Sequence, residues 1–184
     1  PTLPEQIKWR PFFAMEVSPI AVAGVLVVGA TGAAIRMVGP LFAYDSALDA
    51  GQIALFLALF ILGGALAQFP VGYLADKFAK RSLMISLSLL TIIVSFIMQF
   101  EAVRFILGDY QIFILVFVFG MATIPIYSLS ATHANDLCQK QDMTDLSASL
   151  IFFFAIGAIA SPIVSGALID NFGPDILFVY FAIL

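Results

Sequence analysis

Long apolar segments that are almost free of charge constrain this sequence more than any other feature. The only charged residue inside them is Arg36. The five segments cover residues 17–44, 51–75, 82–100, 112–131 and 146–169. A helix needs about 20 apolar residues to cross a bilayer. The runs are continuous rather than alternating, which favours membrane-spanning helices over the strands of a barrel.

Composition supports this interpretation and excludes other classes. The chain is 62% hydrophobic and 11% charged over 184 residues, outside the range of soluble globular domains. Its net charge of −4 is spread through short loops, which gives no sign of a nucleic-acid partner. His133 has only Asp136 at ligand spacing and Cys138 is the single cysteine, so we expect no metal site and no cofactor. No phosphate loop or nucleophile elbow is present, and an enzyme is not expected.

The two ends of the chain complete the predicted architecture. Residues 1–16 form a polar lead without the features of a cleaved signal peptide. Apolar residues resume at 176–184, about half of the roughly 20 needed for a span. We therefore expect an all-α membrane protein of six helices, with the last one truncated.

Basic residues predict the orientation, because cytoplasmic loops retain Lys and Arg. If the lead is cytoplasmic, only Arg104 falls in an outer loop. The residues that then fall on the inside are Lys8, Arg10, Lys77, Lys80, Arg81 and Lys140.

A short pattern occurs twice at helix exits. Gly72-x-Leu-x-Asp76-x-Phe-Ala is echoed by Gly166-x-Leu-x-Asp170-x-Phe-Gly. The second and fifth predicted helices leave opposite faces of the membrane, so the copies indicate two inverted three-helix repeats, an arrangement typical of transporters.

The stretch from 72 to 81 resembles the signature loop of the major facilitator superfamily, Gly-x-Leu-x-Asp-Arg/Lys-x-Gly-Arg-Arg/Lys. The matching residues are Gly72, Leu74, Asp76, Lys77, Lys80 and Arg81. Ala79 stands where the family has a second glycine, which we expect to restrict the loop's backbone. The resemblance implies a six-helix half of a twelve-helix carrier in a bacterial inner membrane.

Two further runs are similar to the C-terminal half of bacterial carriers of the YcaD-like branch. They are Gln68-Phe-Pro-Val-Gly72 and Ile124-Pro-Ile-Tyr127-Ser-Leu followed by His133-Ala-Asn-Asp136. This resemblance implies that the chain corresponds to helices seven to twelve.

The signature stretch is predicted to be a conformational latch, formed by Gly72, Asp76, Lys77, Lys80 and Arg81. A carboxylate at a helix C-terminus is poorly placed for its own helix dipole, so Asp76 needs an outside partner. The family implies that the opposite six-helix half supplies it. The alternative is a local pair with Lys80 or Arg81. Asp136 is a further candidate to cap or latch a neighbouring helix end.

Arg36, Gln68 and Tyr127 are candidates for the substrate path. A charge inside a span is a functional hypothesis by default. The alternative for Arg36 is that it reaches toward the surface to meet Asp45 or Asp49. Gln68 and Tyr127 could equally hold helices together by hydrogen bonds. Prolines at 70, 125 and 162 are expected to kink their helices.

These observations predict a secondary active transporter of a small solute that works by alternating access, with this chain as one half. An accessory or assembly subunit without transport activity is the alternative, because no Asp or Glu lies near the middle of a span. A homodimer of half-carriers is a third possibility.

Overall fold

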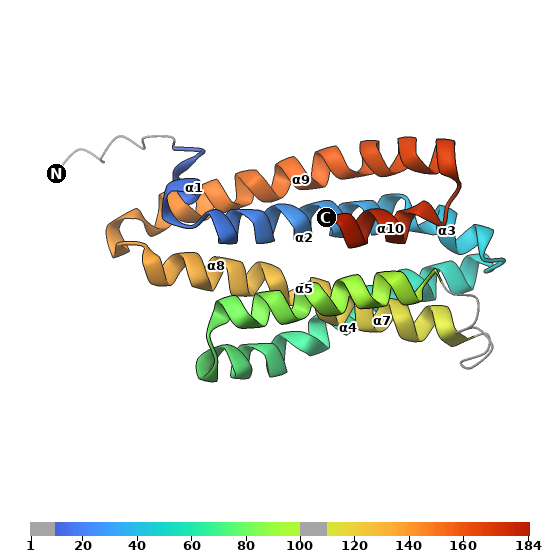
Figure 1. Cartoon of the computed structure of the whole chain (residues 1–184), viewed down its shortest axis with the longest axis horizontal. Helices are drawn as coiled ribbons and strands as arrows, with labels where there is room; N and C mark the ends of the chain where they lie inside the picture. Colours follow the sequence, from blue (N-terminus) through green and yellow to red (C-terminus); the bar gives the residue numbers. More distant parts are fainter. Residues whose placement is uncertain (1–9, 100–109) are drawn as a thin grey trace.

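The structure is a computed structural model that describes residues 10–99 and 110–184, and it is all-helical over that part (Figure 1). Lys8, Arg104 and the end of the segment predicted for 82–100 lie outside the described residues. The helices are α1 Phe13–Val17, α2 Pro19–Met37, α3 Gly39–Asp45, α4 Ala50–Lys77, α5 Lys80–Ile97, α7 Gln111–Thr123, α8 Pro125–Leu137, the 3₁₀ turn η2 Lys140–Asp142, α9 Met143–Phe172 and α10 Ile176–Ile183.

Five of the described stretches are long and apolar enough to cross a membrane. They are Pro19–Met37, Ala50–Lys77, Lys80–Ile97, Gln111–Leu137 and Lys140–Phe172. Large apolar side chains on their surfaces are bare, such as Phe69 (87% exposed) and Ile163 (70% exposed). Exposed apolar surface of this extent suits contact with lipid rather than water.

Two predicted segments differ from the structure at prolines. The segment expected to be one helix over 17–44 is divided at Val38 into α2 and α3. The segment expected over 112–131 is divided at Ile124 into α7 and α8, and it continues to Leu137. Pro40 and Pro125 lack the N–H that would continue the helical ladder, which explains both breaks. Pro70 and Pro162, in contrast, lie inside α4 and α9 without ending them.

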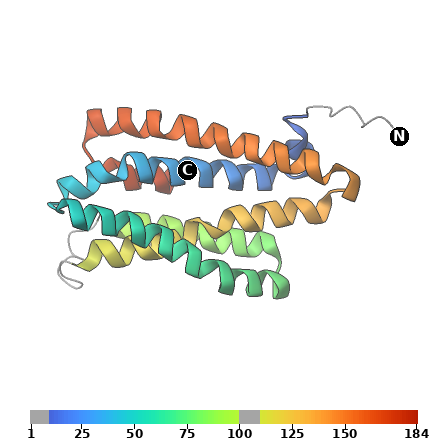
Figure 2. The same cartoon turned by 180° about the vertical axis from the view of Figure 1, so that it is seen from behind.

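The helices form two closely packed pairs with further helices between and beside them. α2 packs against α9, and α4 packs against α7. α9 and α4 lie at opposite edges of the bundle in both views (Figures 1 and 2). α8 contacts both α2 and α5, and α10 packs on α5 and α9.

The buried side chains form two cores, one toward each end of the bundle. One core contains the C-terminal part of α2 with α3, α4, α7 and α10, and it includes edge-on contacts of the Phe178 ring with Phe42 (4.8 Å) and Phe119 (5.5 Å). The other joins α1, the start of α2, α8 and the start of α9. Each end of the bundle is therefore held by its own set of apolar contacts.

Candidate latch at the α4 to α5 turn

The signature stretch is more helical than a loop between helices would be. Gly72, Asp76 and Lys77 lie in the last turns of α4, and α5 begins at Lys80. Only Phe78 and Ala79 connect the two helices, and the Phe78 N–H donates to the Leu74 carbonyl at 2.8 Å. The turn is therefore short and fixed at both sides.

Ala79 occupies its position without backbone strain. Its φ is −59° and its ψ is 121°, in a region that any residue adopts. The restriction of backbone freedom that we expected from Ala79 in place of glycine therefore causes no strain in this conformation.

An ion pair connects this turn to a distant helix end. The Lys80 ammonium donates to the Asp136 carboxylate near the end of α8, across 56 positions in the sequence. The side chain of Lys80 is 18% exposed and that of Asp136 is 56% exposed. Because Asp136 is largely solvated, such a pair contributes about 0–1 kcal/mol to stability. It sets the relative position of α5 and α8 more than it stabilises the fold.

The other charges of the stretch have different surroundings. The Lys77 ammonium donates to the Tyr73 hydroxyl one turn earlier and lies 4.2 Å from the centre of that ring. Asp76 is exposed and forms no ion pair with any residue that the structure describes. The local pair of Asp76 with Lys80 or Arg81 is thus absent from this conformation, and its carboxylate is open to an outside partner.

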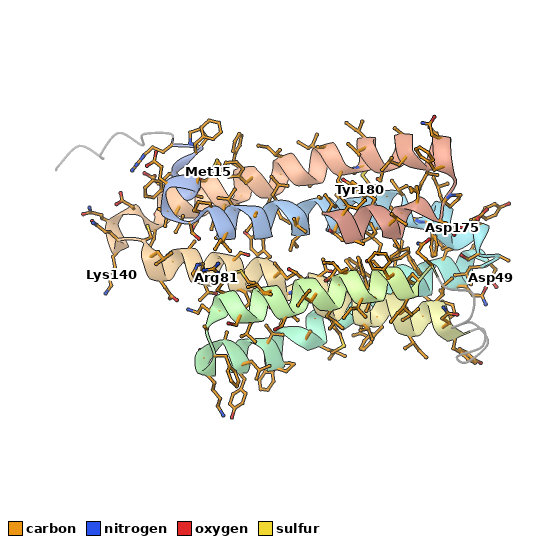
Figure 3. The ribbon with its side chains drawn as sticks, in the orientation of Figure 1. Met15, Asp49, Arg81, Lys140, Asp175 and Tyr180 are labelled. Atoms are coloured by element: carbon orange, nitrogen blue, oxygen red, sulfur yellow. The ribbon has the colours of Figure 1, made fainter. Side chains whose placement is uncertain are left out.

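Figure 3 shows where this site lies along the bundle. Arg81, Lys140 and Met15 lie toward one end, and Asp49 and Asp175 lie at the other. The turn from α4 to α5, the turn from α8 to α9, and α1 therefore share one end of the molecule.

The second copy of the pattern lies at the opposite end. Gly166 is within α9 and Asp170 is exposed near its last turn. A Cβ built on Gly72 or on Gly166 would meet no atom within 4 Å. Packing within the described chain therefore explains neither glycine.

Other glycines have a clear packing role. A Cβ on Gly29 of α2 would lie 2.2 Å from the Phe154 carbonyl oxygen, and one on Gly157 of α9 would lie 2.2 Å from that of Leu26. Each glycine thus contacts the carbonyl of the residue three positions before the other glycine. Only a glycine permits this approach between two membrane helices.

The pair α4 and α7 repeats this contact. A Cβ on Gly63 would lie 2.1 Å from the Phe117 carbonyl oxygen, and one on Gly120 would lie 2.0 Å from that of Phe60. Sequence reasoning missed Gly63 and Gly120. The available signal was the Gly63-Gly64 pair and the lone Gly120 within apolar spans, but neither identifies its partner.

The three candidates for the substrate path do not come together. The Arg36 Nε donates to the Gly32 carbonyl at 2.6 Å in the last turn of α2. The Ser128 hydroxyl donates to Gln68 Oε1 at 3.0 Å, which joins α8 to α4. The Tyr127 ring packs edge-on against Phe154 at 5.5 Å. Gln68 and Tyr127 thus make interhelical contacts. Arg36 is exposed and forms no ion pair with a described residue, and therefore none with Asp45 or Asp49.

A groove of about 520 Å³ is lined by none of these three residues. It is lined by α2, α5, Ile126 of α8 and the last residues of α10, with Arg81 at the α5 start. Its other polar side chains are Ser88, Thr91 and Thr123. The Thr91 and Thr123 hydroxyls each donate to a carbonyl of their own helix, so the groove offers few free polar groups.

Titratable side chains at the α8 to α9 turn show no arrangement for a metal. No group of three His, Cys, Asp or Glu residues occurs within residues 10–99 and 110–184. Burial raises the pKa of the Cys138 thiol, and the Asp142 carboxylate acts in the same direction. The thiol is therefore protonated, and weakly nucleophilic, to higher pH than a free cysteine.

Comparison with known proteins identifies a matching family and two similar proteins. The family model described as Major Facilitator Superfamily matches residues 20–184. An uncharacterised MFS-type transporter, YcaD, of Escherichia coli is 23% identical over 163 residues. An uncharacterised MFS-type transporter of Yersinia enterocolitica is 20% identical over the same length. Each alignment covers 89% of this chain but 41% of the relative, so the chain spans about two fifths of the length of these proteins.

Proposed function

Because the chain belongs to the Major Facilitator Superfamily, we propose that it is one half, the C-terminal one, of a secondary active transporter of a small solute. The other half would be a second six-helix bundle, and the two would alternate the access of a central site between the membrane faces. The main observation in support is that the α2–α9 pair and the α4–α7 pair pack through the same kind of glycine contact.

The glycine contacts support an inverted repeat. Gly63 in α4 and Gly157 in α9 are 94 positions apart, and so are Gly72 and Gly166. The same offset thus relates a packing contact and the signature pattern. Each pair, α2 with α9 and α4 with α7, is built on reciprocal glycine to carbonyl contacts. Two three-helix units of opposite orientation, with α10 beginning the last helix, would produce this equivalence.

The charge distribution supports a cytoplasmic position for the latch. Described basic residues at the Arg81 end are Arg10, Lys77, Lys80, Arg81 and Lys140. The positive-inside rule places such an end in the cytoplasm. The bacterial relatives are consistent with this assignment, and the proposal is therefore a multi-pass protein of a bacterial inner membrane with its N-terminal lead on the cytoplasmic side.

In this proposal, the latch works through the Asp76 carboxylate. The Lys80 to Asp136 ion pair fixes the turn against α8, while Asp76 at the end of α4 has no ion-pair partner within residues 10–99 and 110–184. The N-terminus of a helix in the other half would attract Asp76 by its partial positive charge. This contact would form when the cytoplasmic side closes and break when it opens.

The decisive variant is Asp76→Asn in the complete carrier, reconstituted in vesicles with a solute found by screening. Removing the charge should lower the transport rate about three- to tenfold, the size expected for one charge-to-dipole contact. Solute binding should persist, because Asp76 is far from the middle of its span. Asp45→Asn, which alters an exposed carboxylate at the end of α3, is the matched control and should transport normally. Equal rates for both variants, or loss of binding in Asp76→Asn, would contradict the latch.

The same vesicles test the accessory-subunit alternative. That alternative rests on the absence of Asp and Glu from the middle of the described spans. A wild-type protein that moves no solute but purifies in a stable complex with another membrane protein would favour it.

A further inference from the structure

The segment before α2 folds back onto α9. The Ser149 side chain, which is 1% exposed, donates to the Pro11 carbonyl at 2.6 Å and accepts from the Ala14 N–H at 3.0 Å. These two hydrogen bonds cross about 135 positions of sequence. One buried hydroxyl thus satisfies two backbone groups of the segment.

Apolar contacts hold the same segment. Phe13 and Ala14 are buried in the core at this end of the bundle, with Leu146, Leu150 and Phe153 of α9. The Phe12 ring packs edge-on against Phe153 at 6.0 Å. A linker that only had to reach the next helix would not bury these groups.

The outer side of the segment is closed by a charged residue. Arg10 lies 4.0 Å from the centre of the Phe13 ring and 3.4 Å from the Glu16 carboxylate. Phe13 is therefore covered by α9 on one side and by a guanidinium on the other.

The segment continues into α2 through a fixed corner. The Ser18 N–H donates to the Ala14 carbonyl at 2.8 Å, and the Ser18 hydroxyl accepts from the Ala21 N–H at 3.3 Å. This second bond caps α2, whose first residue is Pro19. No glycine lies between Arg10 and Pro19, so the segment, the corner and the start of α2 follow one another without a residue of high backbone freedom.

α2 and α9 are thereby attached to each other at two places along their length. One is the reciprocal contact of Gly29 and Gly157. The other is Ser149, eight positions earlier in α9 and so about 12 Å away along the helix. α2 and α9 also pack directly against each other, so the Ser149 hydrogen bonds add an attachment through residues 11 and 14 to an existing helix–helix contact.

We propose that residues 10–18 form a strap that fastens α2 to α9, so that these two helices move as one rigid body. The inference rests on the proposed function, because a rigid pair matters where two bundles move against each other. Ser149 is a positioning residue in this device and contacts no solute.

Three serine variants of the complete protein test the strap. Ser149→Ala removes both hydrogen bonds and leaves the buried Ala14 N–H and the partly buried Pro11 carbonyl unpaired, so opening of the strap should become roughly tenfold more frequent. Ser149→Thr keeps the hydroxyl and should lie closer to wild type. Ser147→Ala is the control, because Ser147 is exposed and its hydroxyl bonds only to the Met143 carbonyl of its own helix.

Two measurements report the strap without any solute. Hydrogen exchange at the Ala14 amide should accelerate about tenfold in Ser149→Ala. Maleimide labelling of Cys138, which packs against the same core, should also accelerate, as followed on the peptide that contains it. Values for Ser149→Ala equal to those for Ser147→Ala would overturn the strap.

Transport then tests the coupling. In vesicles, Ser149→Ala should lower the maximal rate several-fold with an unchanged KM, and Ser149→Thr should restore most of it. An open strap with a normal maximal rate would overturn the role in movement. If the wild type transports nothing, the proposed function fails, while exchange and labelling still decide whether the strap exists.

Discussion

The charged residues of the latch differ in whether their side chains have partners. Lys80 and Lys77 both have partners, in Asp136 and Tyr73, whereas Asp76 has none among the described residues. A partly exposed ion pair contributes little free energy, because solvent screens it. Its effect is therefore geometric: it holds the start of α5 at the end of α8.

A double-mutant cycle measures that ion pair. Asp136→Asn, Lys80→Gln and the double variant should give a coupling free energy of about 0.5–1 kcal/mol in thermal unfolding of detergent-solubilised protein. Lys77→Gln combined with Asp136→Asn serves as the control and should give additive effects. The same coupling for Lys77 with Asp136 as for Lys80 with Asp136 would contradict a specific pair between Lys80 and Asp136.

At the level of helices, the glycine contacts limit what substitution allows. Gly120→Ala places a Cβ 2.0 Å from a backbone oxygen, so α4 and α7 must separate. We expect a loss of about 1–3 kcal/mol in the free energy of unfolding, as for other overpacked sites. Gly72→Ala and Gly166→Ala are matched controls, since open space surrounds both positions.

Thermal unfolding in detergent compares these variants directly. The two controls should unfold at or slightly above the wild-type temperature, because alanine favours helix more than glycine does. Equal destabilisation of Gly120→Ala and Gly72→Ala would contradict the close contact between α4 and α7.

The helices show how far the sequence alone could lead. Apolar length was enough to locate the spans, because a bilayer demands about 20 such residues whatever surrounds them. The break at Ile124 falls at Pro125, where a kink was expected, whereas the break at Val38 was not predicted. Pro70 and Pro162, with the same local signal, lie in uninterrupted helices. Gly63 facing Gly120, and Lys80 facing Asp136, depend on which helices become neighbours. No local pattern contains that information.

For the whole molecule, the two ends differ in charge, and this difference predicts the orientation in the membrane. Lys140 and Asp175 lie at opposite ends (Figure 3). In a Cys138→Ser background, Asp175→Cys should react with an impermeant maleimide in intact cells. Lys140→Cys should react only after the inner membrane is permeabilised. The reverse pattern would place the latch outside and contradict the proposed orientation.

The break at Ile124 removes one backbone hydrogen bond inside the fourth span, because Pro125 has no N–H, and bending therefore costs less there than elsewhere in the span. α7 is clamped to α4 at Gly120, whereas α8 extends from Pro125 to the acidic end that meets Lys80. An arm of 13 residues is about 20 Å long, so a tilt of about 10° moves its tip by about 3 Å. That displacement is enough to separate an ammonium from a carboxylate while the clamp stays closed. The effects of Gly120→Ala and Asp136→Asn on unfolding should therefore add, because the two residues lie on opposite sides of the break and have different partners.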